Sequence, residues 1–189
     1  MALRKLLMCI GNAMSNFLKT WRTMSVEAFS NLGNKVLTGS VFDALAYQSK
    51  EKYVKTILIS GKFWAGLQPN HLALLEHAMM YYKTHLIILA FNSTKSLYEF
   101  HGFPQLGFYN DFDRAEIFSH MLLVDFVCWF DEKTPVELCK KLHPDILLKG
   151  EDWRGKDIPE ETFCGDVEFV RLEKEYHTSD KIRKPWDTK

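Results

Sequence analysis

The spacing of apolar residues along the chain changes near residue 55. Before that point apolar residues recur at helical spacing, and three glycines interrupt the pattern, Gly11, Gly33 and Gly39. From Thr56 onward, short apolar runs alternate with stretches of helical period. We therefore expect an N-terminal helical extension over residues 1–50 and an α/β domain over residues 51–189.

Five short apolar runs in the second part predict the strands of one sheet. We expect strands over residues 56–60, 85–90, 124–129, 145–148 and 167–170. Periodic stretches predict helices over residues 71–82, 111–122, 135–142 and 178–183. Alternating strands and helices form a parallel sheet covered on both faces, so the expected fold is α/β, a Rossmann-like, doubly wound five-stranded parallel sheet. Ligands of such folds bind at the carboxyl ends of the strands.

One helix start is marked by Thr134-Pro135-Val136-Glu137. This order places a hydroxyl at the N-cap, proline at N1 and glutamate at N3, as in a capping box. We expect the helix that follows to begin at Pro135 with Thr134 as its cap.

Charge and composition narrow the classes of partner. The chain has 24 basic and 24 acidic residues, so no net charge favours nucleic acid or an anionic membrane. A small anionic substrate would have to be held by local groups. No run of 18 apolar residues is present, so no membrane span is expected.

Cysteine usage and the N-terminus bear on the compartment. Four scattered cysteines, without metal-ligand spacing, predict free thiols in a reducing cytoplasm: Cys9, Cys128, Cys139 and Cys164. The first 24 residues carry basic residues and no acid, which leaves an organelle transit peptide open. An amphipathic helix that packs on the domain or on another subunit is the preferred interpretation, and it would allow a homo-oligomer.

A candidate ligand site follows the fourth predicted strand. Ile146-Leu147-Leu148 ends in Lys149-Gly150-Glu151-Asp152-Trp153. A cation, a glycine, two acids and a tryptophan at the end of a buried strand suit a polar ligand.

This stretch resembles the nucleotidyltransferase domain of heptose-1-phosphate adenylyltransferases, and more distantly glycerol-3-phosphate cytidylyltransferase, of the cytidylyltransferase-like superfamily. In that family the strand ends in KGGD(Y/W), and a later STT begins the last helix. The resemblance covers about residues 55–184. It implies that Lys149, Gly150 and Asp152 meet the nucleotide, and that Thr178 and Ser179 hold phosphate.

The family's signature loop, G-x-F-D-x-x-H-x-G-H, follows the first strand. The chain matches it at Gly61, Phe63, Pro69 and His71, with one extra residue inserted. Trp64 replaces the aspartate, Gln68 the first histidine and Asn70 the glycine. The resemblance implies catalytic roles for His71, Gln68 and Lys149, and a nucleotide pocket shaped by Gly61 and Phe63. Gln68 can donate a hydrogen bond to phosphate, but it cannot carry charge.

Other family positions are partly kept. Asn92 matches the family's V-N-S-D and Arg114 its E-D-R, which implies that both contact the nucleotide. In the phosphate-holding K-G-x-x-R-P stretch, His101 replaces the lysine and Leu106 the arginine. Lys62 and Lys95 are candidates to replace these cations.

Two hypotheses follow. The first is an enzyme that transfers AMP or CMP from ATP or CTP, with Mg²⁺ as the accompanying ion, to a sugar phosphate or similar small phosphate, and releases pyrophosphate. No residue is assigned as a protein metal ligand. The second is a catalytically impaired relative that serves as a nucleotide-binding or scaffold subunit. The sequence leaves open the base, the sugar and the oligomeric state.

Overall fold

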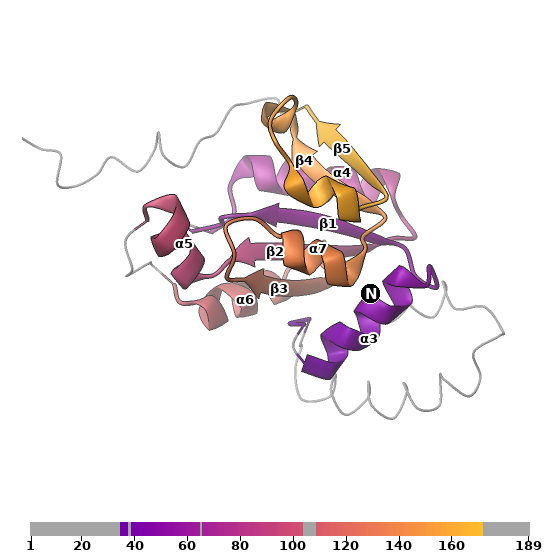
Figure 1. The fold of residues 1–189 in the computed structure, drawn as a ribbon, viewed down its shortest axis with the longest axis horizontal. Helices are drawn as coiled ribbons and strands as arrows, with labels where there is room; N and C mark the ends of the chain where they lie inside the picture. The colour runs from indigo at the N-terminus through magenta and orange to yellow at the C-terminus, as the bar shows by residue number, and fades with distance from the viewer. Residues whose placement is uncertain (1–34, 38, 65, 104–108, 172–189) are drawn as a thin grey trace, which may run out of the picture.

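The computed structural model describes residues 35–37, 39–64, 66–103 and 109–171 (Figure 1). Its main elements follow in the order α3 (Gly39–Lys50), β1 (Thr56–Gly61), α4 (Pro69–Tyr81), β2 (Leu86–Asn92), α5 (Thr94–His101), α6 (Asp111–Ser119), β3 (Phe126–Phe130), α7 (Val136–Leu142), β4 (Ile146–Gly150), the 3₁₀ turns η2 (Glu151–Trp153) and η3 (Pro159–Phe163), and β5 (Asp166–Val170).

The five strands form one sheet in the order β3-β2-β1-β4-β5 (Figure 1). Every neighbouring pair is parallel, with β1 at the centre pairing Ile57 with Ile87 on one side and with Ile146 on the other. The predicted α/β fold with a five-stranded parallel sheet is confirmed.

Side chains on the central strand alternate between two cores. Leu58 faces a core to which α3, α7 and η3 contribute, whereas Ile57 and Ile59 face a core with α4 and α6. All three side chains are fully buried. This is the pattern of a parallel sheet covered on both faces, and it explains why the strands appear as continuous apolar runs in the sequence.

The bounds of the predicted strands lie within two residues of the observed ones, and β1 to β4 extend one or two residues further at their carboxyl ends than predicted. Helix α5 was not expected. The expected capping box on Thr134 is wrong, because α7 begins at Val136 with Pro135 as its N-cap and without a side-chain cap. The predicted helix over residues 178–183 lies outside the described residues.

Residues before β1 also reach the sheet. Val36 forms a parallel bridge with Val127 on β3, and Leu37 and Leu45 are buried in the core shared with α7. The division of the chain at residue 50 stays a prediction, but residues 35–50 complete one face of the domain.

Within the described ranges, no helix is long and apolar enough to cross a membrane. Cys128, Cys139 and Cys164 are free, while Cys9 lies outside the ranges that the structure covers. The cytoplasmic location and the homo-oligomer stay predictions.

Candidate active site

A cavity of about 800 Å³ lies at the carboxyl ends of the strands. Strands β1, β2 and β3 succeed one another toward one edge of the sheet, and β4 then pairs with the other side of β1, so the chain reverses its direction between β1 and β4. Open α/β sheets bind ligands at this reversal. Ser60 and Gly61 of β1 and Lys149 and Gly150 of β4 line the cavity there.

The loop after β1 makes a tight turn at Phe63, whose φ of +46° is in the left-handed region that non-glycine residues rarely adopt. The Phe63 ring packs against Gly61, where an added Cβ would lie 3.0 Å from it. On its other side the ring meets His71 edge-on, with centroids 4.4 Å apart. The strained turn thus places the Phe63 ring in contact with the His71 imidazole.

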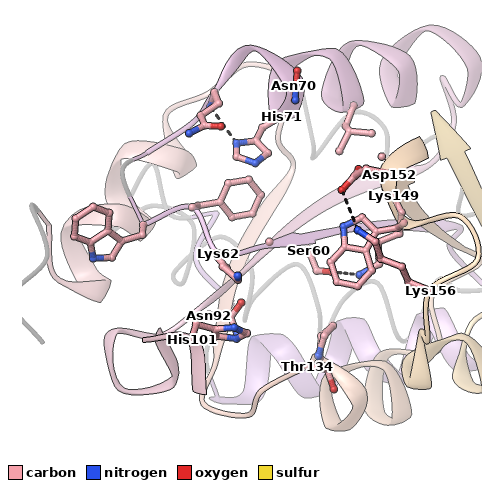
Figure 2. Close-up of a pocket in the computed structure, with 18 of the residues that line it drawn as sticks. Ser60, Lys62, Asn70, His71, Asn92, His101, Thr134, Lys149, Asp152 and Lys156 are labelled. Atoms are coloured by element: carbon pink, nitrogen blue, oxygen red, sulfur yellow. Dashed lines mark hydrogen bonds and ion pairs between the residues drawn. The ribbon is translucent and has the colours of Figure 1, made fainter. Parts of the chain in front are cut away.

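His71 lies in the first turn of α4 and lines the cavity (Figure 2). Its Nδ1 accepts a hydrogen bond of 3.0 Å from the backbone N–H of Gln68. Burial lowers the pKa of His71 to about 4, so the ring is neutral at pH 7. Since Nδ1 is an acceptor, the proton sits on Nε2, and His71 can donate one hydrogen bond to a ligand.

Gln68 is the N-cap of α4 and forms a capping box with His71. It lines the cavity, but its backbone and side chain both serve to hold His71 and the helix start. The structure therefore places Gln68 where the resemblance predicts, with a part in orienting His71.

Lys149 is buried, and its ammonium group already has two partners. It donates to Ser60 Oγ at 3.0 Å and to Glu160 Oε1 at 2.8 Å. The side chains of Lys149 and Glu160 are only 5% and 3% exposed, so the ion pair is shielded from water. The ammonium also lies 4.8 Å from the centre of the Trp153 ring. Lys149 faces the cavity as part of a neutral pair rather than as an isolated cation.

Asn92 also lines the cavity, but its amide group binds protein atoms. Nδ2 donates to Ser96 Oγ at 2.9 Å and to the carbonyl of Glu132 at 3.2 Å. These bonds attach the loop after β3 to the end of β2. The Asn92 amide nitrogen therefore positions this loop, instead of making the contact with nucleotide that was predicted for Asn92.

Arg114 requires a correction, because it lies beneath the cavity and does not line it. It is 1% exposed, with its guanidinium 4.4 Å from the centre of the Phe91 ring. It donates to the carbonyls of Lys62 at 3.2 Å and Asn92 at 3.0 Å, and pairs with Asp111 at 2.6 Å. Burial lowers the pKa of Arg114, with Asp111 acting in the opposite direction. Its role is to hold the ends of β1 and β2 together.

The remaining predicted residues have three outcomes. Lys62, Gly150 and Asp152 line the cavity as expected, whereas Lys95 does not. Thr178 and Ser179 lie outside the described residues.

Several lining residues were not assigned from the sequence. They are Ser60, Trp64, Asn70, Phe103, Lys133, Thr134, Lys156, Glu160 and Arg171. Lys133 and Thr134 follow β3, and Arg171 follows β5, so the rule that ligands meet the carboxyl ends of parallel strands was the signal that could have found them.

The charge of the cavity differs from that of the chain as a whole. Among the described residues it is lined by five lysines and arginines and by three acids, and one of those acids, Glu160, is paired with Lys149. A neutral chain thus concentrates positive charge where the strands end, as an anionic ligand requires.

Comparison with known proteins gives relatives over most of the chain. It is 31% identical over 163 residues to the bifunctional protein HldE of Campylobacter curvus (strain 525.92), covering 86% of this chain and 34% of that protein. It is 33% identical over 140 residues to the bifunctional protein HldE of Campylobacter jejuni subsp. doylei, covering 74% of this chain and 30% of that protein. The chain thus spans about a third of the length of these relatives. No family model matches it.

Among solved structures, the fold is similar to that of a lipopolysaccharide core biosynthesis protein from Thermoplasma volcanium GSS1. The TM-score is 0.50 at 17% identity, and the match covers 65% of this chain and 98% of that one. At this identity the likeness concerns the fold alone.

Proposed function

We propose that this chain, a relative of the bifunctional HldE proteins with a cytidylyltransferase-like nucleotidyltransferase fold, transfers the adenylyl group of ATP to a sugar phosphate. A heptose 1-phosphate is the first acceptor to test, because heptose-1-phosphate adenylyltransferases are the family that the sequence resembles. CTP is the alternative donor. The observation that carries the proposal is the neutral, cavity-facing His71 at the start of α4, beside a cation-rich end of a parallel sheet.

The reaction asks little covalent chemistry of the protein. A phosphate oxygen of the acceptor attacks the α-phosphorus of ATP, the bond from that phosphorus to the bridging oxygen breaks, and pyrophosphate leaves with the electron pair. Catalysis then consists of positioning and of stabilising the charge that grows on the phosphate oxygens. In the proposal, His71 Nε2–H donates to one of those oxygens, and the capping contact with Gln68 fixes the direction of that bond.

The nucleotide is proposed to bind at the β4 side of the cavity. There Gly150, Asp152 and Trp153 line the wall, and Lys156 lies 3.8 Å from Asp152. Gly150 allows close approach to the backbone, and Trp153 offers a partly exposed ring for stacking. Thr178 and Ser179 stay candidates for phosphate binding on the strength of the resemblance.

Mg²⁺ would accompany the triphosphate. In the described part of the chain, no group of three or more His, Cys, Asp or Glu side chains is arranged to hold a metal ion. Magnesium in nucleotide sites is commonly held by substrate phosphates with one or two carboxylates. Glu151 and Asp152 are carboxylates at the cavity that fit this requirement. The ion would neutralise phosphate charge.

The test is pyrophosphate release from ATP or CTP with a heptose 1-phosphate and a panel of other sugar phosphates. We expect release that depends on both substrates and on Mg²⁺, and that falls about a hundredfold in His71→Asn, the scale of one lost charge-stabilising donor. Nucleotide affinity, measured by calorimetry, should change much less. Release that is unchanged in His71→Asn would remove His71 from the mechanism.

A catalytically impaired, nucleotide-binding or scaffold protein is the second candidate. It is favoured by Gln68, which stands where the family has a histidine, and by Glu160, which neutralises the charge of Lys149. Gln68→His tests this candidate. A gain in pyrophosphate release would identify Gln68 as an impairment, whereas no release from either form with any acceptor, together with ATP binding, would favour the scaffold.

A further inference from the structure

We infer that Lys62, Lys133 and Thr134 form the subsite that binds the phosphate group of the acceptor, and that His101 positions the loop that carries Lys133 and Thr134. We call Lys62, Lys133 and Thr134 the acceptor subsite. The inference rests on the proposed nucleotidyl transfer and assigns a second wall of the same cavity, opposite the β4 side.

These three residues and His101 come from three connections at the carboxyl ends of neighbouring strands. Lys62 follows β1, His101 is the last residue of α5 after β2, and Lys133 and Thr134 lie between β3 and α7. All four line the cavity. Figure 2 shows Lys62 and His101 close together with Asn92, away from Lys149 and Lys156. His101 Nε2 lies 3.2 Å from the carbonyl oxygen of Lys133, and burial, followed by the charge of Lys62, lowers the pKa of His101.

The charge of the acceptor subsite is unbalanced. Lys149 and Lys156, on the β4 side, lie within 4 Å of Glu160 and Asp152, respectively. Within the ranges that the structure describes, neither Lys62 nor Lys133 forms an ion pair with a carboxylate. Burial lowers the pKa of Lys62, as expected for an ammonium group held close to protein without a counter-charge. A phosphate dianion would supply that charge.

The loop that carries Lys133 and Thr134 is held in place before any ligand binds. Ser96 Oγ donates to the carbonyl of Glu132 at 2.6 Å, and Asn92 Nδ2 to the same carbonyl at 3.2 Å. His101 Nε2 lies 3.2 Å from the carbonyl of Lys133, which makes Nε2 the protonated nitrogen. Bonds of this kind preorganise a binding loop and reduce the entropy lost on binding.

Thr134 was expected to cap α7, but Pro135 is the N-cap. Thr134 itself lines the cavity, where its hydroxyl can donate to a phosphate oxygen.

The neighbouring wall favours the acceptor over the terminal phosphate of ATP as the ligand. Trp64 and Phe103 line the cavity with ring centroids 5.2 Å apart, and Lys62 lies 5.7 Å from the centre of the Phe103 ring. A polyphosphate chain has no apolar surface to place on these rings. The carbon face of a sugar ring has one, so a sugar bearing a phosphate matches both the rings and the cations.

The first test separates the two phosphate sources by kinetics. In Lys133→Ala and in Thr134→Val, the KM for a heptose 1-phosphate should rise about tenfold or more, as for a lost hydrogen bond to a charged group, while the KM for ATP changes little. Lys95→Ala is the matched control, because Lys95 is an exposed lysine on α5 that pairs with Asp131 at 3.9 Å and does not line the cavity. A rise confined to the KM for ATP would assign the subsite to ATP, and an equal rise in both KM values or no rise in either would overturn the inference.

The second test does not depend on turnover. Calorimetry with inorganic phosphate should show binding at millimolar concentration that is weakened about tenfold in Lys133→Ala and unaffected in Lys95→Ala. If ATP binds but phosphate affinity is the same in all three proteins, the acceptor subsite is wrong and the proposed function stands. If ATP does not bind while phosphate binding is lost in Lys133→Ala, the anion site stands and the nucleotidyl transfer fails.

Discussion

Among single residues, His71 owes its neutral state to its surroundings. Burial lowers its pKa to about 4, because a charged ring would be poorly solvated there. Protonation of Nδ1 would also break the hydrogen bond that the Gln68 N–H donates to it. The unfolded chain has the ordinary histidine pKa, near 6.5. Between these values the unfolded state binds more protons, so the free energy of unfolding must fall as the pH is lowered through this window.

This predicts how stability and activity depend on pH. Urea unfolding of the wild type should show a lower free energy at about pH 4.5 than at pH 7, and His71→Asn should lose that part of the difference. Turnover should not follow a His71 titration above about pH 5, because the ring is already neutral there. An identical pH dependence of stability in both proteins would contradict the assignment.

Lys149 and Glu160 form a buried ion pair, which complicates any test by substitution. Removing one partner of such a pair leaves a buried charge, at a cost of roughly 3–5 kcal/mol. Lys149→Ala should therefore lower the free energy of unfolding by about that amount, apart from any effect on nucleotide binding. The double variant Lys149→Met with Glu160→Leu should recover most of the loss, as measured by urea unfolding. A single variant as stable as the wild type would show that the pair is not shielded from water.

The sequence located about half of the residues that line the cavity, but not their partners. Lys149 and Gly150 could be predicted because they lie in a recognisable motif at the end of β4, and His71 because it ends the motif that follows β1. Arg114 also lies at a motif, yet it is beneath the cavity, since a motif does not tell which face of helix α6 a side chain occupies. Glu160 was missed because its pairing with Lys149 depends on the path of η3.

At the scale of elements, burial decided which parts could be predicted. Strands β1 and β2 are buried on both faces and give continuous apolar runs that are read directly. Helix α5 has only eight residues, too few to establish a helical period in the sequence, and its Tyr98 and Phe100 are exposed. Its signal was the N-cap Ser93, whose side chain accepts from the N–H of Ser96.

The edge strand β5 is attached to α4 through one carboxylate. Glu168 accepts a hydrogen bond from Tyr82 and lies 2.7 Å from His77 Nε2. The bond from Tyr82 to Glu168 is the main reason that the pKa of Tyr82 is raised to about 12. Tyr82→Phe should lower the free energy of unfolding by roughly 1–2 kcal/mol and speed hydrogen exchange of the β5 amides. Tyr81→Phe, at a neighbouring position that is 69% exposed, is the control and should change neither. Slow β5 exchange in Tyr82→Phe would contradict the attachment.

For the molecule as a whole, the sequence predicted the parallel sheet and the edge that carries the site. It could not predict the order β3-β2-β1-β4-β5, because local periodicity carries no information about which strands become neighbours. That order brings together the connections after β1, β2, β3 and β4, which are up to about ninety residues apart in the chain, around one cavity. The acceptor subsite is proposed where the connections after β1, β2 and β3 meet.

Whether residues 35–50 belong to the folded domain is a question about the whole molecule. Residues 35–50 bury Leu37 and Leu45 against the sheet, and Ser49 Oγ lies 2.8 Å from Thr56 Oγ1. Deleting residues 1–50 removes the two leucines from the core, a loss of roughly 2–3 kcal/mol for each buried side chain. A domain with a typical stability of about 5–15 kcal/mol would become marginal. We therefore expect the fragment 51–189 to unfold at a clearly lower urea concentration than the full chain.

Leu45→Ala should reproduce about 2–5 kcal/mol of the loss, whereas Tyr47→Ala, at a position of α3 that is 51% exposed, should have a much smaller effect. A fragment 51–189 as stable as the full chain would place the boundary at residue 50 and make α3 an appendage.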